Sequence, residues 1–258
     1  MSKIIKFVDK IYNKPITCLT AYSGSVAQIL DGNVDMILIG DSLGSTLYNM
    51  KNTQGVTLEM MKMHGKAVTN NVKKSITIID MPYKSYTTKY KALKNARELL
   101  DYSKANILKL EISKKSIPII DYLSKKKFKV IAHIGVTPQS YSDFKKIKVV
   151  GRNEFERIKL LNLALSAEKA GAKAVLLECV VESLSKEITS ALSIPTIGIG
   201  SSKFCDGQVL VFDDIVGINN ENLPKFVKKF MDLEQQMKRA VGKFSKEVKL
   251  RKFPSKKF

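Results

Sequence analysis

Residues 34–44 read VDMILIGDSLG, a short aliphatic run that ends directly in a polar, glycine-containing turn. The run at 35–40 is continuous in Met, Ile and Leu rather than alternating, which is typical of a strand buried on both faces of a parallel sheet. Comparable runs recur along the chain at residues 16–21, 75–80, 106–111, 129–134, 174–179 and 195–200, with a candidate eighth at 208–213. The chain therefore repeats a buried strand seven or eight times.

Amphipathic stretches separate these runs and predict helices at residues 57–69, 88–103, 154–170, 182–192 and 225–241. The clearest is 154–170. Its apolar residues Ile158, Leu161, Leu165 and Ala170 follow helical spacing, and Gly171 supplies the stop. Strands that alternate with helices indicate a parallel sheet covered by helices.

Seven or eight such units in 258 residues predict one (βα)8 barrel domain over residues 1–258. We expect a C-terminal helix and, after about residue 242, a basic, flexible tail. An open doubly wound sheet is the alternative architecture. The last unit leaves two interpretations open: residues 208–213 form the eighth strand, or they begin a helix capped by Asp206.

Composition excludes several classes of protein. The longest apolar runs are strand-sized, so we expect no membrane partner, and residues 1–10 lack the features of a signal peptide, so we expect a cytoplasmic protein. Cys18 and Cys179 lie in apolar runs and read as core residues. The net charge of +20 is spread over scattered lysines without the aromatic interleaving of RNA-binding modules, so we expect no nucleic-acid partner.

Ionisable side chains stand at the ends of five of the runs: Asp41, Asp80, Glu111, His133 and Glu178. In a barrel the carboxyl ends of the strands converge on one face, where active sites are built. We therefore expect these residues to meet in space.

The chemistry follows from the residue types. Asp41, Asp80 and Glu111 are converging carboxylates that need a cation, and hard oxygen ligands suit Mg²⁺. Such an ion can chelate a 2-keto acid and stabilise an enolate. Glu178 is then the candidate base, and Lys109 lies near enough to meet the substrate's negative charge.

Ser42 follows Asp41 in the glycine-containing turn, where its hydroxyl and backbone N–H could bind an anion.

Each residue also has a structural interpretation. Asp41 could cap a helix, and Asp80 could serve the turn before Met81. Glu111 could pair with nearby lysines, including Lys109 in the same strand, and His133 could be a satisfied core histidine. His64, in a helical stretch rich in methionine, reads as a helix-surface or core-edge residue.

At these residues the sequence resembles the ketopantoate hydroxymethyltransferase family. The resemblance is carried, in family order, by TAY at 20–22, GDSLG at 40–44, DMPY at 80–83, LKLE at 108–111, HIGVTPQS at 133–140, KVVGR at 148–152, LECV at 177–180, IPTIGIG at 194–200 and DGQVLV at 206–211.

The resemblance implies a (βα)8 barrel that binds Mg²⁺ through Asp41 and Asp80, with Glu111 reaching the metal through water. It also implies that Ser42 and Lys109 contact the substrate carboxylate.

By the same resemblance, His133 lines the substrate pocket and Glu178 is the general base. The implied reaction transfers a hydroxymethyl group from 5,10-methylenetetrahydrofolate to 3-methyl-2-oxobutanoate, giving 2-dehydropantoate and tetrahydrofolate, in the first step of pantothenate and coenzyme A biosynthesis. Family members form homo-oligomers, often decamers.

The chain departs from the family pattern in three loops. Ile112–Lys114 replaces a Gly-Gly pair after Glu111, Ser201–Ser202 replaces an Ala-Gly pair, and residues 141–144 lack the family's glycines. A rival is a phosphoenolpyruvate mutase or isocitrate lyase type of enzyme, but the catalytic-cysteine loop expected of those enzymes is missing from the sequence. A non-enzyme rival is a basic nucleic-acid-binding protein or a degenerate barrel kept as a scaffold.

Overall fold

The computed structural model describes residues 14–143, 147–218 and 223–255. The N-terminal residues 1–10 and Phe144, on which two of the expectations above fall, lie outside the described residues. Contacts divide the chain into two compact units, Met1–Leu210 and Val211–Phe258.

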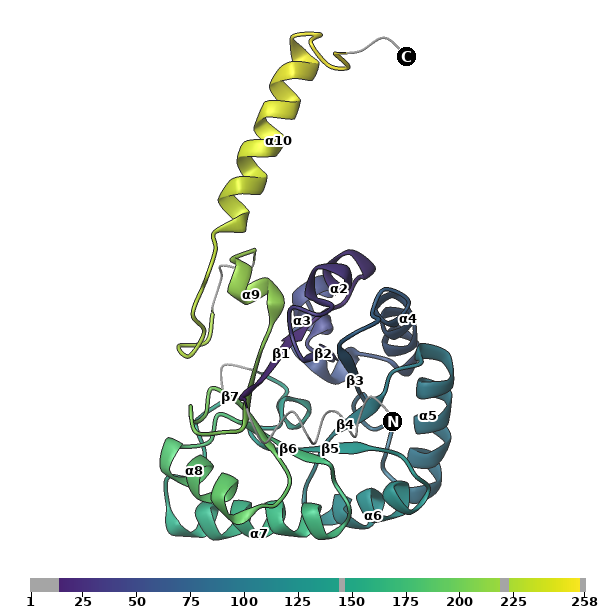
Figure 1. Cartoon of the computed structure of the whole chain (residues 1–258), viewed down its shortest axis with the longest axis vertical. Helices are drawn as coiled ribbons and strands as arrows, with labels where there is room; N and C mark the ends of the chain where they lie inside the picture. Colours follow the sequence, from purple (N-terminus) through teal and green to yellow (C-terminus); the bar gives the residue numbers. More distant parts are fainter. Residues whose placement is uncertain (1–13, 144–146, 219–222, 256–258) are drawn as a thin grey trace. The chain divides into compact units, whose positions relative to one another are not determined.

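The first unit is a closed barrel of eight parallel strands (Figure 1). The strands are β1 (Ile16–Thr20), β2 (Met36–Ile39), β3 (Ile76–Asp80), β4 (Ile107–Glu111), β5 (Val130–Gly135), β6 (Ala174–Glu178), β7 (Thr196–Ile199) and β8 (Gly207–Leu210). Each strand pairs with the next, and β8 closes the barrel by pairing with β1, Val209 opposite Cys18. The predicted (βα)8 architecture is confirmed, and the open sheet is wrong.

The eighth strand-helix repeat contains both a strand and a helix, the two alternatives that the sequence left open. Gly207–Leu210 is the eighth strand, and a short helix, α9 (Phe212–Val216), begins two residues later. Asp206 does not cap it; its carboxylate accepts from Thr196 N and Oγ1 at 2.8 and 3.1 Å. Asp206 thus joins the starts of β7 and β8.

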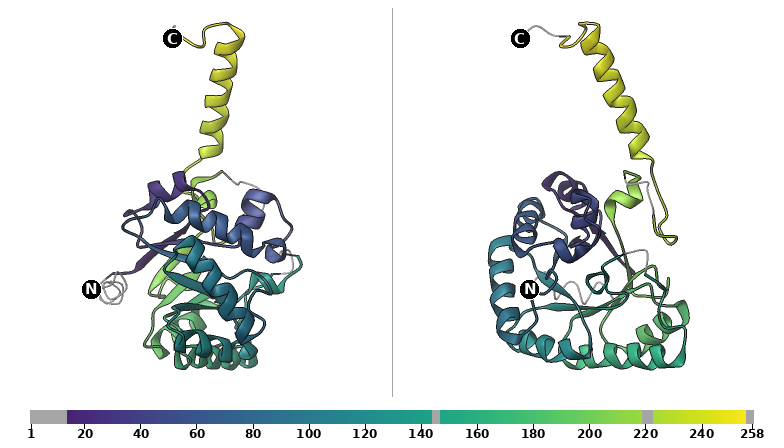
Figure 2. Two further views of the ribbon diagram at one scale, coloured as in Figure 1. Left: turned by 90° about the vertical axis from the view of Figure 1, so that its right-hand side faces the viewer. Right: turned by 180° about the vertical axis from the view of Figure 1, so that it is seen from behind.

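Helices surround the strands in the first unit (Figure 2). They are α2 (Gly24–Leu30), α3 (Leu43–Tyr48), α4 (Leu58–Thr69), α5 (Lys89–Ser103), α6 (Ile117–Lys125), α7 (Glu154–Lys169) and α8 (Glu182–Ala191), with 3-10 turns η1 (Thr53–Gly55), η2 (Lys114–Ser116) and η3 (Pro138–Ser140). Thr57, Thr88 and Asn153 accept from backbone N–H groups in the first turns of α4, α5 and α7. These side-chain caps fix where the helices begin.

The sequence misassigned the buried face of α7. Ile158 and Leu165 are 52% and 37% exposed, and the face turned to the barrel carries Leu160, Ala164 and Ala167. Apolar residues occur on more than one side of this helix, so spacing alone could not select the face. Small alanines let the helix backbone approach the strands closely.

The barrel interior is packed with apolar side chains below a polar layer. Ile78, Ile107, Ile131 and Leu176 belong to the buried core cluster. Residues two apart on a strand share a face, so Asp80, Lys109, His133 and Glu178 point into the same interior, one step nearer the carboxyl ends. The apolar layer therefore forms the floor on which the ionisable residues sit.

The second unit contains α9 and α10 (Leu233–Lys249). The helix predicted at 225–241 is confirmed only over 233–241. Asp232 caps the start of α10 by accepting from Gln235 N, and the helix continues to Lys249. Before it, Phe230 N donates to Ile215 O at 2.8 Å and holds the chain in a non-helical path. The tail expected after about residue 242 stays a prediction; its first residues continue α10.

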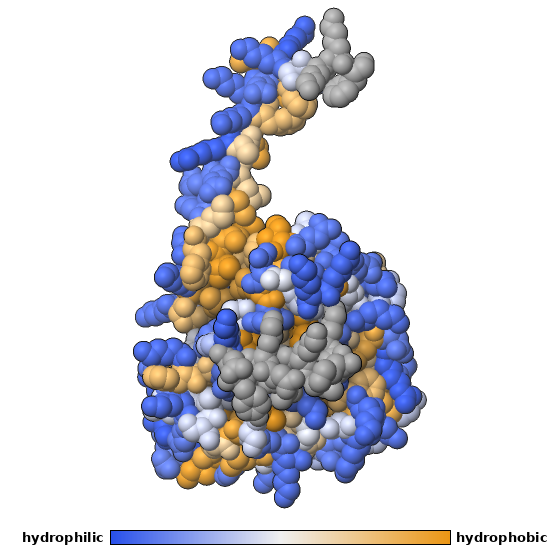
Figure 3. Space-filling view, viewed as in Figure 1, coloured by the Kyte–Doolittle hydropathy of each residue, from blue (hydrophilic) through white to orange (hydrophobic). Residues whose placement is uncertain are grey.

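Helix α10 is amphipathic, with hydrophilic residues along one side and hydrophobic ones along the other (Figure 3). Met237, Val241, Phe244 and Val248 are exposed on the hydrophobic side. Every helix in the described ranges is too short or too polar to span a membrane.

Candidate active site

The five predicted strand-end residues and Lys109 are brought together at the carboxyl end of the barrel. Asp41 follows β2, Asp80 ends β3, Lys109 and Glu111 lie in β4, and the remaining two residues belong to the next strands, His133 in β5 and Glu178 in β6. Strand register sets Glu111 opposite His133 and Gly135 opposite Glu178. The sequence prediction that these residues meet is confirmed by their contacts.

Asp41, Asp80 and Lys109 form the first group of contacts. Lys109 Nζ lies 2.9 Å from Asp80 Oδ1, and the backbone N–H of Asp41 donates to Asp80 Oδ2 at 3.0 Å. All three residues are at most 6% exposed. Asp41 is not a helix cap, because Ser42 occupies the N-cap position of α3. Asp80 is therefore held in place from two sides.

Gln139 connects the carboxylates across the barrel mouth. Its Nε2 donates to Asp41 Oδ2 at 2.7 Å and to Met81 O at 3.0 Å. Its backbone N–H donates to Glu111 Oε2 at 3.0 Å, and its Oε1 accepts from Tyr86 OH at 2.7 Å. This buried side chain thereby links the ends of β2, β3 and β4 to the turn after β5.

Lys109, His133 and Glu178 form a line of contacts. Lys109 Nζ is 3.2 Å from His133 Nδ1, and His133 Nε2 is 3.2 Å from Glu178 Oε2. Lys109 can only donate, so Nδ1 accepts and the proton of the neutral imidazole lies on Nε2, facing Glu178. Nε2 has no partner with hydrogen-bond geometry, so this contact has the right distance but is not yet aligned.

Burial perturbs the acidity of these groups. Burial raises the pKa of Glu178 to about 7, against the opposing effect of Lys109. Burial and the Asp80 carboxylate raise the pKa of Asp41 to about 7, and burial and Asp41 raise the pKa of Glu111 well above its usual range. Asp41 and Glu178 are therefore poised to exchange protons near neutrality.

The two basic groups shift in opposite directions. Burial alone lowers the pKa of Lys109, but Asp80, Asp41 and Glu111 together raise it, so Lys109 stays charged. Burial and then Lys109 lower the pKa of His133 well below its usual value. His133 is therefore neutral, and its contacts with carboxylates are not ion pairs.

Ser42 lies at the carboxyl end of the barrel and contacts Tyr22, which follows β1. Its Oγ lies 2.7 Å from Tyr22 OH. A Cβ added to Gly40 would lie 2.9 Å from this Oγ, so the glycine leaves the room that the hydroxyl needs. Ser42 is held near Asp41 with its hydroxyl in a fixed place.

The charge balance at the barrel mouth suits a divalent cation. Among the described residues of this cluster, the carboxyl groups of Asp41, Asp80, Glu111 and Glu178 lie around one ammonium, that of Lys109. Burial and then neighbouring carboxylates raise the pKa of Asp41 and of Glu111. Asp80 Oδ1 is buried without a hydrogen bond of good geometry. Hard carboxylate oxygens are the ligands that Mg²⁺ takes, usually one or two with several waters.

Asp41 and Asp80 could hold such an ion. Within the described ranges, no three His, Cys, Asp or Glu side chains are already arranged to hold one metal ion. The Glu111 carboxylate accepts from the backbone N–H of Gln139. The expectation that Glu111 reaches the metal through water stays a prediction.

Sequence reasoning missed Gln139 and Tyr86. Gln139 lies inside the HIGVTPQS motif, so the motif was a signal, but nothing local indicated that a glutamine after a proline would turn into the barrel. Tyr86 OH also donates to Glu111 O at 3.1 Å. Two other expectations hold: Cys18 and Cys179 are buried, and His64 is half-buried beside Tyr22 O.

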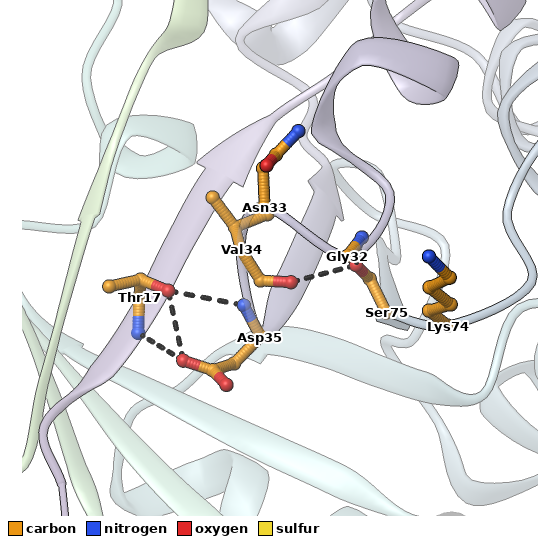
Figure 4. Close-up of a pocket in the computed structure, with 7 residues that line it drawn as sticks. All are labelled: Thr17, Gly32, Asn33, Val34, Asp35, Lys74 and Ser75. Atoms are coloured by element: carbon orange, nitrogen blue, oxygen red, sulfur yellow. Dashed lines mark hydrogen bonds between the residues drawn. The ribbon is translucent and has the colours of Figure 1, made fainter.

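Two hollows lie at opposite ends of the strands. One, of about 280 Å³, is at the amino ends and is lined by residues including Thr17, Asp35 and Ser75 (Figure 4). Asp35 accepts from Thr17 N and Oγ1, and Ser75 Oγ donates to Val34 O, so these groups satisfy one another. The other, of about 320 Å³, adjoins Glu111 at the carboxyl ends. Catalysis belongs at the carboxyl ends, and the opposite end serves stability.

Sequence comparison finds a matching family and close relatives. A model of the family described as ketopantoate hydroxymethyltransferase matches residues 3–256. A 3-methyl-2-oxobutanoate hydroxymethyltransferase of Pelagibacter ubique is 45% identical over 255 residues, covering 99% of this chain and 98% of that protein. The enzyme of the same name from Rhizobium etli is 44% identical over 94% of this chain and 89% of its own.

Solved structures share the fold at low identity. Phosphonopyruvate hydrolase in complex with oxalate and Mg²⁺ matches with a TM-score of 0.64 at 10% identity, covering 99% of this chain and 91% of that one. 2,3-Dimethylmalate lyase, of the PEP mutase/isocitrate lyase superfamily, matches with a TM-score of 0.61 at 12% identity, covering 100% and 99%. At these identities the likeness concerns the barrel alone.

Proposed function

The chain belongs to the ketopantoate hydroxymethyltransferase family, and on that premise we propose that it transfers a hydroxymethyl group from 5,10-methylenetetrahydrofolate to 3-methyl-2-oxobutanoate. The product is 2-dehydropantoate, which would place the enzyme at the start of pantothenate synthesis. The observation that carries the proposal is the line Lys109–His133–Glu178, which sets a carboxylate with a pKa of about 7 beside a neutral imidazole whose other nitrogen contacts a buried cation.

The reaction balances with one water. The C3–H bond of the keto acid and one O–H bond of water break, a C–C bond and a C–O bond form, and both N–C bonds to the donor's methylene are replaced by N–H bonds. The first chemical step is removal of the C3 proton, for which a base near neutrality is best suited. Glu178 Oε2 is the base that we assign to it.

The residues around Glu178 bind and orient the substrate anion. Lys109 remains protonated and offers positive charge to the substrate carboxylate or to the enolate, and Ser42 offers a hydroxyl and a backbone N–H to the same anion. His133 Nε2 lies 3.2 Å from Glu178 Oε2, and the positive charge of Lys109 favours the ionised, reactive form of Glu178. Glu178 is 18% exposed, so the base is sheltered but reachable.

Asp41 and Asp80 would hold the Mg²⁺. When bound, the ion would supply Lewis-acid stabilisation of the charge that develops on the keto oxygen. The chain's own part is to keep both carboxylates in place. Lys109 and the Asp41 backbone N–H fix Asp80, and Gln139 fixes Asp41.

The test separates the two halves of the reaction. Exchange of the C3 proton of 3-methyl-2-oxobutanoate for deuterium is followed by proton NMR, with Mg²⁺ and with EDTA, and the folate donor is then added. We expect metal-dependent exchange and, with donor, 2-dehydropantoate. Absence of exchange in folded, metal-loaded protein would refute the proposed function. Exchange without product would refute the hydroxymethyl transfer and retain only the enolate chemistry.

A further inference from the structure

A cavity of about 320 Å³ opens beside the carboxylate cluster and is not used by the keto-acid chemistry above. It lies among the loops that follow β3, β4 and β5. Glu111 and Gln139 belong both to its lining and to the cluster, so the cavity adjoins the carboxylates. A molecule in this cavity would have one end at the reacting centre.

The inner part of the cavity offers aromatic and apolar surface. Tyr83 and Tyr86 line it together with Ile112 and Ile119. The hydroxyl of Tyr86 is fixed by its bonds to Glu111 O and Gln139 Oε1, so its ring is held at the boundary of the cluster. Rings with fixed orientation favour a flat, aromatic ligand.

The outer part of the cavity carries positive charge. Lys84 and Lys115 line it, and both are exposed. Lys84 has a φ of 58°, a conformation that favours glycine, in a turn closed by Ser85 N donating to Pro82 O at 3.0 Å. Lys84 Nζ lies 5.1 Å from the centroid of the Tyr83 ring, so this positive charge adjoins the aromatic part of the cavity.

We propose that this cavity binds the folate donor, with the ring system against Tyr83 and Tyr86 and the glutamate carboxylates at Lys84 and Lys115. The inference rests on the proposed function. A folate consists of a flat heterocycle, a benzoyl ring and a glutamate tail. The rings match the aromatic inner part of the cavity, and the glutamate carboxylates match its rim, formed by Lys84 and Lys115. A volume near 300 Å³ is within the range of ligand pockets and suits the ring end.

The loop after β4 is where this chain has Ile112 and Ser113 in place of glycines, and both side chains line the cavity. Two residues of the cavity lining therefore depart from the family pattern. Ser113 is exposed, so a larger side chain there would enter the cavity without disturbing the core.

The experiment measures donor KM and donor-independent exchange in parallel. Lys84→Met and Lys115→Met remove one charge each, and Lys114→Met is the matched control, an exposed lysine in the same η2 turn outside the cavity lining. We expect each rim variant to raise the KM for 5,10-methylenetetrahydrofolate about two- to fivefold, the range of an exposed ion pair. The effect should be greater for a triglutamate donor and weaker at high salt.

A second variant, Ser113→Trp, tests the cavity itself. We expect it to abolish donor-dependent product while C3 exchange with Mg²⁺ stays at the wild-type rate. An unchanged donor KM in both rim variants and in Ser113→Trp would overturn the proposal, as would an equal rise in Lys114→Met. Because wild-type exchange and product formation are measured in the same assay, failure of the proposed function is distinguished from failure of the cavity assignment.

Discussion

Gln139 Nε2 donates to Asp41 Oδ2 at 2.7 Å, across 98 residues of sequence. The bond uses one carboxylate oxygen of Asp41 and leaves the other for a ligand. The same amide group also accepts from Tyr86 and donates to Met81 O, so its orientation is fixed by three partners. We regard Gln139 as a positioning residue for Asp41 and Glu111.

Gln139→Met should weaken Mg²⁺ binding by about 10- to 100-fold, because residues that orient metal ligands contribute on this scale. Isothermal titration with Mg²⁺, and with Mn²⁺ as a second probe, measures it. Gln28→Met is the control, since Gln28 is exposed on α2 and donates to Asn71 Oδ1 at 2.7 Å. Unchanged metal affinity in Gln139→Met would contradict the assignment.

Glu178→Gln should slow C3 exchange by about 10²- to 10⁴-fold, the usual contribution of a general base. Metal and keto-acid binding should remain, because the amide keeps the size of the side chain. Glu182→Gln, an exposed residue in the first turn of α8, serves as control. If exchange in Glu178→Gln equalled that of the wild type, the base would have to be another group.

The exchange rate should rise with pH and level off above about 7. Burial raises the pKa of Glu178 to about 7, and only the ionised carboxylate accepts the C3 proton, so the active fraction grows as pH increases through this value. A pH series of exchange rates at saturating Mg²⁺ measures the midpoint. A rate that was flat between pH 5 and 8, or that fell with rising pH, would contradict a carboxylate base.

Removing Lys109 should destabilise the protein by about 3–5 kcal/mol, because Lys109→Met leaves Asp80 buried without its cation. Both side chains are at most 7% exposed, so solvent screens the pair little. Urea unfolding in EDTA measures the loss. Adding Asp80→Asn to the same chain removes the uncompensated charge and should restore much of the stability. A double variant as unstable as Lys109→Met would show that lost packing, not charge, was the cause.

Most of the barrel could be predicted from local sequence patterns. The β2 run, MILI followed by Gly-Asp, shows both the strand and its polar end within ten residues. The predictions of the buried face of α7 and of the start of α10 failed for the same reason. Apolar residues such as Ile158 and Phe230 indicate a buried position only when the surrounding elements cover them, and here both are exposed.

The sequence by itself determined the strand-helix order, the convergence of Asp41, Asp80 and Glu178 at one end, and the family, because side-chain period and strand polarity are local properties. Tertiary structure alone decided that Gln139 turns inward to Asp41 and Glu111, and that Lys109 pairs with Asp80 rather than with its neighbour Glu111. Those choices depend on barrel closure and register, which bring residues from distant strands within hydrogen-bonding distance and bury them together.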